Sequence, residues 1–314
     1  MEKRFEHVKI ELPKKFDEEG NLIRDGIDGN YAVVSINRPD KLNAMTIQTM
    51  REISEAIETL EFDETIRCVV LRGTKDYTKK PSFSTGQDLT SAFGPEVKLN
   101  IPWHMPHIIQ KYHQYFGIIE DFPKPLIAAV DGFALGGGTE LTLLCDIVIA
   151  SKRSSFGFAE IKRGIFPAAG GTQRMIRYIG LGKATRMLYF GETFSAETMA
   201  DWGLVTFLVE DDEFEKVVHD KARELGNSAT TSLIVMKRCI RLGTQVPLKI
   251  GLQLEQIGLG LNFISQDVKE GVTAFSRRIK CPVCKGKGKM EDGTNCANCA
   301  GARKIKDTPC FKGY

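Results

Sequence analysis

The sequence has little of what marks a membrane protein, a secreted protein or a nucleic-acid binder. It contains no run of about 20 uncharged apolar residues, the length that a membrane-spanning helix needs. Its start, MEKRFEHVKI, carries charges where a secretory signal is apolar. The net charge is only +3 over 314 residues, so charge alone predicts neither nucleic acid nor a membrane as a partner. We therefore expect a cytoplasmic protein.

Cysteine is scarce over most of the chain. Only Cys68, Cys145 and Cys239 occur before residue 280, and their apolar surroundings predict buried thiols that act as small hydrophobic side chains. Hydrophobic residues at 42% and charged residues at 26% are ordinary values for a folded globular protein. The other cysteines crowd into the C-terminal tail, which indicates a separate role for that segment.

Short apolar runs alternate with helical patterns over much of the chain. The runs YAVVSIN, RCVVLRG, PLIAAVDG and DIVIAS predict strands, and the pattern at 46–60 predicts a helix. Such alternation is typical of an α/β fold. From about Ser228 the pattern is helical only, and after Lys280 the composition shifts to Gly, Lys and Cys. We expect three parts: an α/β catalytic core at 1–213, a helical subdomain at 214–279 and a small module at 280–314.

Three segments carry candidate chemistry. Gly136 to Gly138 join a predicted strand to a helix whose first turn holds Glu140, and amides at a helix start can hold a developing oxyanion. A glycine triplet predicts mere tight packing about equally well. A second glycine-bearing turn, PSFSTGQDL, could offer another amide to the same oxygen. Glu160 lies between aromatic and small residues, although a single glutamate is usually solvated surface.

At these places the sequence resembles the crotonase family, the enoyl-CoA hydratases and isomerases. The family motifs stand here as NRPDKLNAM, FSTGQDL, DGFALGGGTEL, FGFAEIKRGIFPAAGGTQRM and LNFISQDVKEGVTAF, in order, between about Phe5 and Arg278. The resemblance implies a repeated β-β-α core with a C-terminal helical trimerisation region, forming a homotrimer or homohexamer. It implies an oxyanion hole from the amides of Gln87 and Gly137, and an acid/base pair from Glu140 and Glu160.

The implied substrate is an acyl-CoA thioester, with coenzyme A as part of the substrate and no redox cofactor. Family isomerases typically lack one of the two carboxylates, so both together favour hydration of an enoyl-CoA or the reverse dehydration. Double-bond isomerisation and thioester hydrolysis remain alternatives within the family. The resemblance also places five residues along the CoA path, although Lys41 fits a plain surface lysine equally well: Asp40, Lys41, Leu42, Thr85 and Asp88.

The sequence departs from the family pattern at two positions near the predicted site. Gln87 replaces a small residue, so its side chain could shape the pocket, and Ala159 stands where a proline often precedes the second glutamate. Residues 94–117 fall in the family's variable acyl-pocket segment, and their aromatic and Met side chains predict an apolar wall. The histidines of this segment are expected on the surface or in packing, without a catalytic role: His104, His107 and His113.

The tail has the spacing of a zinc site. Cys281, Cys284, Cys296 and Cys299 form two C-x-x-C pairs, the arrangement that a tetrahedral Zn²⁺ needs, and resemble one unit of a DnaJ-type zinc domain. Disulfides are the alternative, which a cytoplasmic location disfavours. Four thiolates leave no open coordination position, so we expect a structural zinc, with Cys310 free or an alternative ligand. The tail is basic, so RNA or protein binding by a catalytically silent scaffold is a second hypothesis.

Overall fold

The computed structural model describes residues 5–17, 19–90, 98, 100–280, 285, 287, 289–290, 294 and 304–306. The chain divides into two compact units, Met1–Gly226 and Asn227–Tyr314, and each is described by itself. Within the described residues no helix combines the length and the apolar composition needed to cross a bilayer.

A six-stranded sheet forms the centre of the first unit. Its strand order is β1-β4-β5-β7-β9-β12; β1 is antiparallel to β4, and the other neighbours are parallel. The four central strands are apolar and largely buried, as expected for parallel strands covered on both faces. The bounds are β1 (Val8–Glu11), β4 (Tyr31–Ile36), β5 (Cys68–Gly73), β7 (Leu126–Val130), β9 (Ile147–Ser151) and β12 (Phe207–Val209).

A second, four-stranded sheet has the order β11-β10-β8-β6. Its strands are β6 (Ser82–Ser84), β8 (Phe133–Leu135), β10 (Ser155–Gly157) and β11 (Thr193–Ser195). Strands β5, β7 and β9 of the large sheet are each followed in the chain by one short strand of the small sheet. This regular step confirms the predicted repeated β-β-α core and brings the loops after β6 and β8 together.

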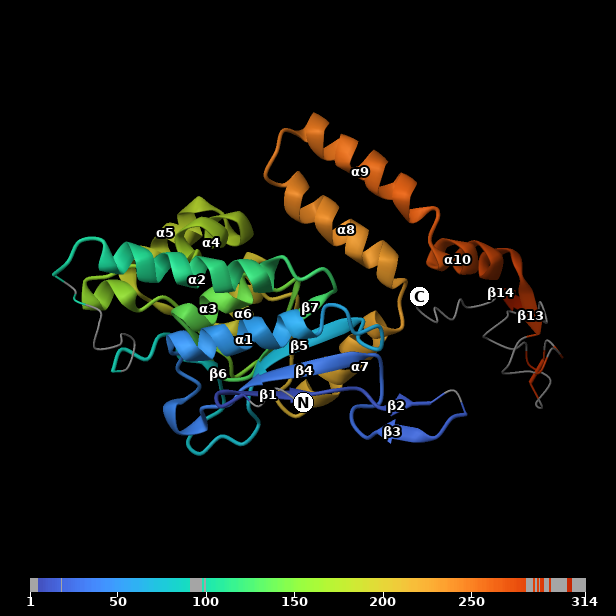
Figure 1. Cartoon of the computed structure of the whole chain (residues 1–314), viewed down its shortest axis with the longest axis horizontal. Coiled ribbons are helices and arrows are strands. Elements are labelled where there is room, and N and C mark those ends of the chain that lie inside the picture. The colour runs from blue at the N-terminus through green and yellow to red at the C-terminus, as the bar shows by residue number, and fades with distance from the viewer. Residues whose placement is uncertain are drawn as a thin grey trace. The chain divides into compact units, whose positions relative to one another are not determined.

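Helices cover both faces of the large sheet (Figure 1). Ala32, Val34 and Ile36 of β4 face a core shared with α1 and α2, whereas Tyr31 and Val33 face a smaller core under α7. Because α7 packs on the sheet, it belongs to the first unit, although the sequence prediction begins the helical subdomain at its first residue. The helices are α1 (Ile47–Thr59), α2 (His104–Glu120), α3 (Gly137–Thr142), α4 (Gly171–Ile179), α5 (Leu181–Phe190), α6 (Ala196–Trp202) and α7 (Phe214–Gly226), with 3-10 helices η1 (Pro39–Lys41) and η2 (Glu160–Arg163).

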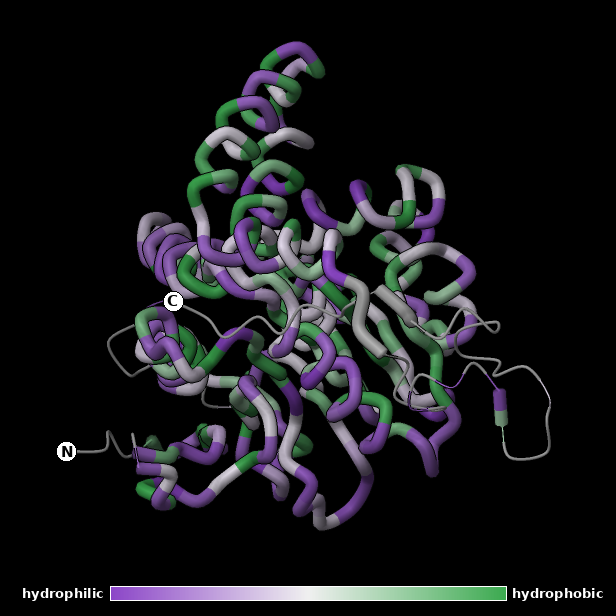
Figure 2. Tube along the Cα trace, turned by 90° about the vertical axis from the view of Figure 1, so that its right-hand side faces the viewer, coloured by the Kyte–Doolittle hydropathy of each residue, from purple (hydrophilic) through white to green (hydrophobic). Residues whose placement is uncertain are grey.

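The second unit is helical, as predicted. It contains α8 (Thr230–Gly243), α9 (Leu248–Asn262) and α10 (Gln266–Ser276), and α8 packs along α9. Figure 2 shows apolar and polar residues alternating along these helices. A Cβ at Gly258 of α9 would lie 2.8 Å from Cγ1 of Val235, so glycine permits the close approach. Of the three thiols predicted to be buried, Cys68 and Cys145 are, but Cys239 on α8 is only half-buried.

Two short strands close the cysteine-rich segment. Strand β13 (Arg278–Lys280) pairs antiparallel with β14 (Lys304–Lys306), which brings the two ends of residues 281–303 together. In the first unit, β2 (Lys15–Phe16) and β3 (Leu22–Arg24) form a small antiparallel hairpin. The predicted zinc ligands and Cys310 lie outside the described residues: Cys281, Cys284, Cys296, Cys299 and Cys310.

Candidate active site

Helix α3 holds Glu140 inside the protein. Gly136, just before α3, has φ +52°, a left-handed conformation that glycine adopts without strain and that turns the chain from β8 into the helix. The Glu140 side chain is buried, with 4% of the residue exposed. Its Oε1 accepts hydrogen bonds from the backbone N–H of Ala169 at 2.9 Å and of Gly171 at 2.8 Å. The loop before α4 thus fixes the direction of this carboxyl group.

Glu160 lies at the first position of η2 and faces the same turn. A Cβ at Gly136 would come within 2.5 Å of its Oε1, so the carboxyl group packs directly on the backbone before α3. Its Oε2 is buried and has no hydrogen-bond partner among the described residues. The two glutamates, far apart in sequence, therefore face one site.

Burial sets the protonation of both carboxyl groups. It raises the pKa of Glu140 to about 7, and the nearby Glu160 adds to this, whereas the N–H of Gly171 opposes it. Burial also raises the pKa of Glu160. A carboxyl group whose pKa lies near 7, as that of Glu140 does, can exchange protons near neutral pH, as acid/base chemistry requires.

Two backbone N–H groups meet beside these carboxyl groups. A Cβ at Gly137 would lie 3.9 Å from the backbone N of Gln87, and a Cβ at Gly86 would lie 3.1 Å from the backbone N of Gly137. Met45 holds the loop in place, since its N–H donates to Gly86 and its carbonyl accepts from Asp88. No hydrogen bond within the described residues uses the N–H of Gln87 or Gly137. Two free, converging donors are the geometry of an oxyanion hole.

Comparisons with known proteins agree with this geometry. A sequence model of the family described as enoyl-CoA hydratase/isomerase matches residues 26–284. The chain belongs to the enoyl-CoA hydratase/isomerase family. It is 34% identical over 253 residues to a short-chain-enoyl-CoA hydratase of Clostridium acetobutylicum, covering 81% of this chain and 94% of the relative. A crotonyl-CoA hydratase of Syntrophomonas wolfei is 34% identical over 249 residues, 79% of this chain and 92% of the relative.

Solved structures of the family share the fold. An enoyl-CoA hydratase from Bacillus anthracis superposes with a TM-score of 0.74 at 29% identity, covering 86% of this chain and 96% of that one. The crotonase core predicted from the sequence motifs is thereby confirmed. A tail beyond residue 284 lies outside the family match.

The residues predicted along the CoA path in this crotonase fall into two groups. Asp40 and Lys41 are exposed in η1, and Leu42 follows them with a φ of +50°. The hydroxyl of Thr85 donates a hydrogen bond to the carbonyl oxygen of Leu42 at 3.3 Å, so these four residues lie together. Asp88 is buried, and its carboxylate bonds Arg38 at 3.1 Å and the hydroxyl of Thr90 at 2.6 Å. Direct contact between Asp88 and the nucleotide stays a prediction.

Helix α2 lies where the sequence predicts the acyl-pocket wall. Its buried face carries Ile108, Tyr112, Phe116 and Ile119, which pack in the hydrophobic core. That this segment also walls an acyl pocket stays a prediction. Their spacing by three or four residues predicts one helix face, which could have singled out Tyr112 from the sequence. Trp103, just before the helix, is 70% exposed.

The α2 histidines make surface contacts, as predicted. His113 is exposed, and its Nε2 contacts the carbonyl of Ala168 at 2.7 Å, while His104 Nδ1 accepts from the N–H of Lys98. His113 thereby ties α2 to the loop that binds Glu140. A second contact joins the same segments: Arg174 forms a hydrogen-bonded ion pair with Glu120 of α2. The sequence does not predict this contact, because the two residues lie 54 positions apart.

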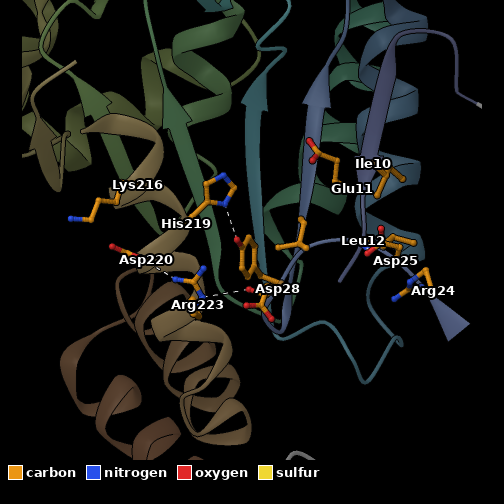
Figure 3. Close-up of a pocket in the computed structure, with 13 residues that line it drawn as sticks. Ile10, Glu11, Leu12, Arg24, Asp25, Asp28, Lys216, His219, Asp220 and Arg223 are labelled. Atoms are coloured by element: carbon orange, nitrogen blue, oxygen red, sulfur yellow. Dashed lines mark hydrogen bonds and ion pairs between the residues drawn. The ribbon is translucent and has the colours of Figure 1, made fainter. Parts of the chain in front are cut away.

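A separate cavity of about 810 Å³ lies between the N-terminal strands and α7 (Figure 3). None of the predicted catalytic residues lines it. Two pairs of its lining residues interact: the Tyr31 hydroxyl with His219 Nδ1 at 2.7 Å, and Arg223 with Asp220 at 2.9 Å. Nη2 of Arg24, which also lines the cavity, is buried without a partner among the described residues. We assign it no chemistry.

No metal cluster is present in the part of the chain that the structure describes, where no three or more His, Cys, Asp or Glu side chains are grouped to hold an ion. The predicted zinc ligands lie beyond that part.

The buried Glu140 makes the stability of the protein depend on pH. Its pKa rises from 4.5 to about 7 on folding, so its neutral form stabilises the folded state fully below pH 4.5 and this contribution is lost by about pH 7. Glutamine stays neutral and can accept both backbone bonds. We expect Glu140→Gln to be more stable than the wild type by about 3 kcal/mol at pH 8, with a smaller difference at pH 4.5, in denaturant titrations at each pH. An equal difference at both pH values would contradict the raised pKa.

Proposed function

We propose that this chain is an enoyl-CoA hydratase, which adds water across the 2,3 double bond of a short acyl-CoA or removes it in reverse. The observation that carries the proposal is the placement of two carboxyl groups, the buried Glu140 and the half-buried Glu160 with its buried Oε2, beside two unused backbone N–H groups. The similarity to proteins named short-chain-enoyl-CoA and crotonyl-CoA hydratase supports the same reaction.

The thioester oxygen binds between the N–H groups of Gln87 and Gly137. As water adds to C3, electrons move through the double bond to this oxygen, and the two amides stabilise the enolate charge. One glutamate accepts a proton from the water and the other delivers a proton to C2, so the atoms of one water molecule balance the reaction. Glu140 Oε1 is taken by two amides, which leaves Oε2 free of those bonds to face the reaction.

The presence of both carboxyl groups favours hydration over isomerisation. Moving a double bond within the acyl chain needs no water, whereas hydration needs a water molecule activated while a proton is delivered nearby. Thioester hydrolysis remains the second family alternative. Each reaction leaves a different product, so a single substrate panel separates them.

The test is hydration of crotonyl-CoA by the purified full-length chain, followed as loss of the conjugated enoyl absorbance. We expect rapid loss with no release of free thiol. Free thiol would instead indicate hydrolysis, and consumption of a 3-enoyl-CoA without water addition would indicate isomerisation. No turnover of any of these thioesters would contradict the proposed enzyme and favour a scaffold that captures RNA or protein.

The tail is proposed to bind one structural zinc through Cys281, Cys284, Cys296 and Cys299. Their spacing fits a tetrahedral thiolate site, and the pairing of β13 with β14 brings the ends of the segment together, which supports a closed metal-bound loop. A tail this short has little apolar core, so metal binding supplies much of its folding free energy.

We expect one zinc per chain in elemental analysis of the purified protein. The double change Cys281→Ser with Cys284→Ser should remove the zinc while the hydration rate stays within about twofold, because four thiolates leave no site for substrate. A chain without zinc would overturn the metal site. Loss of both zinc and rate would instead connect the tail to catalysis.

The helical unit is proposed to join subunits into a trimer or hexamer. Exposed apolar side chains on α8, α9 and α10 support this, because such surface usually marks an interface. Sedimentation velocity of the purified chain tests it, with a monomer as the contradicting result. The exposed apolar residues of these helices include Met236, Ile240, Leu248, Leu252, Ile257, Leu259, Leu261 and Val272.

A cytoplasmic location stays part of the proposal.

A further inference from the structure

Buried polar atoms without partners gather at the active site. Among the described residues, four buried side-chain N or O atoms have no hydrogen-bond partner. Three of them belong to Gln87 (Nε2), Tyr112 (Oη) and Glu160 (Oε2). Such atoms are rare in folded proteins because each costs free energy, so their concentration in one place indicates groups that await a ligand.

Gln87 and Tyr112 are neighbours. Burial raises the pKa of Tyr112 to about 12, and a hydrogen-bonding approach of the Gln87 side chain opposes this rise, so the amide lies beside the hydroxyl. No hydrogen bond of ordinary geometry joins them among the described residues. Tyr112 is 7% exposed on the inner face of α2, and the backbone N–H of Gln87 is one of the two oxyanion donors. Both side chains therefore lie close to the oxyanion donor that Gln87 provides.

The catalytic reaction accounts for only one of the three atoms. Glu160 Oε2 finds its partner in the reacting water, as hydration requires. A hydrocarbon acyl chain offers nothing to Gln87 Nε2 or to Tyr112 Oη, both of which can donate a hydrogen bond. A plain fatty acyl group would leave them buried and unpaired, whereas an acceptor oxygen between them would satisfy both.

The electrostatics distinguish between kinds of acceptor. No lysine or arginine of the described residues is hydrogen-bonded to Tyr112 Oη or forms an ion pair beside it. A carboxylate buried here would have no cation to pair with, which is costly. A neutral keto or hydroxyl oxygen needs only the two hydrogen bonds that Gln87 Nε2 and Tyr112 Oη can donate.

We propose that the preferred substrate is an enoyl-CoA whose acyl group carries a neutral keto or hydroxyl oxygen, bound by Gln87 Nε2 and Tyr112 Oη. This inference rests on the proposed hydratase function and specifies its substrate class. Gln87 and Tyr112 act as specificity residues, and crotonyl-CoA, which lacks the oxygen, becomes a working but poor substrate.

The experiment compares four CoA thioesters of one chain length: a straight-chain 2-enoyl-CoA, its keto analogue, its hydroxy analogue and its terminal carboxy analogue. For the wild-type chain we expect kcat/KM for the keto or the hydroxy analogue to exceed that of the straight chain by at least about tenfold, since a buried donor left unpaired costs about this much. The carboxy analogue should fall below both. Equal or higher values for the straight-chain or the carboxy substrate would overturn the inference.

Tyr112→Phe keeps the ring and removes only the hydroxyl, and Gln87→Met keeps the length and the backbone N–H. Each should reduce the ratio of kcat/KM between the oxygen-bearing and straight-chain substrates by roughly tenfold. Tyr115→Phe is the matched control, because it removes a hydroxyl from the same helix that is not among the unpaired buried atoms. Its ratio should stay at the wild-type value. An unchanged ratio in Tyr112→Phe would mean that water occupies the space between the two groups, and would overturn the proposal.

Binding separates this inference from the hydratase proposal. The saturated forms of the same thioesters cannot be hydrated, so their Kd values by calorimetry report recognition alone. A preference of about tenfold for the keto or hydroxy form, with no turnover of any enoyl form, would contradict the hydratase and keep the inference. Turnover of the enoyl forms without any binding preference would support the hydratase and overturn the inference.

Discussion

Replacing Glu160 by glutamine is expected to lower kcat for crotonyl-CoA by roughly 10²- to 10⁴-fold, the range that a positioned acid or base contributes. Glutamine has nearly the same shape but neither accepts nor releases a proton in the reaction. Oε2 of Glu160 is the buried oxygen of this side chain that has no protein partner in the described structure, so it is the oxygen available to water. The fold should persist because no backbone group depends on that oxygen.

Glu140→Gln should cause a loss of similar size, although its two backbone hydrogen bonds are preserved. Glu52→Gln is the matched control: Glu52 is also buried and its Oε2 also accepts two backbone N–H bonds, from Glu6 and His7, but it lies on α1 away from the reacting groups. Its rate should remain near that of the wild type. Near-wild-type rates in either Glu140→Gln or Glu160→Gln would rule out the two-carboxyl mechanism.

Gly138→Ala is expected to damage both stability and catalysis. The added Cβ would lie 2.2 Å from the carbonyl oxygen of Ser84, so α3 must move away from β6. Helix α3 carries Gly137 and Glu140, and the loop after β6 carries Gln87, so this movement separates the two oxyanion donors. We expect a loss of about 1–3 kcal/mol in the free energy of unfolding, as for other overpacked sites, and about a 10²-fold or larger loss in kcat.

Gly182→Ala provides the control for this substitution. Gly182 lies in α5, and a Cβ there would meet no atom within 4 Å. Alanine favours helix over glycine by up to about 1 kcal/mol, so this variant should be at least as stable as the wild type and equally active. Thermal melts and crotonyl-CoA turnover of Gly138→Ala and Gly182→Ala compare the stability and the activity of the two variants. Equal behaviour of the two would contradict the tight contact between α3 and β6.

The sequence predicted the long elements of the fold well because they rest on local patterns. The run YAVVSIN became β4, RCVVLRG became β5 and DIVIAS became β9, each within a residue of its predicted start. The helix predicted at 46–60 is α1. Strands β6, β8, β10 and β11 were beyond such reasoning, because three residues are too few to show a period and pairing alone creates them.

The candidate site was predicted through motifs, whereas its contacts come from tertiary structure. Glu140, Glu160, Gln87 and Gly137 were named from five ordered motifs, and the structure brings them together. The bonds from Ala169 and Gly171 to Glu140 join segments that no local pattern connects. The proximity of Gln87 to Tyr112 also depends on how α2 packs, so this proposed oxygen-binding pair could be found only from the fold.

In the proposed reaction this chain adds water to an enoyl thioester without breaking the thioester bond. Mass spectrometry of crotonyl-CoA after incubation with the enzyme in water enriched in the heavy oxygen isotope tests this most directly. We expect one heavy oxygen in an intact 3-hydroxyacyl-CoA, and almost none with Glu160→Gln. Heavy oxygen in a free carboxylic acid, or no incorporation into any product of the wild type, would contradict it.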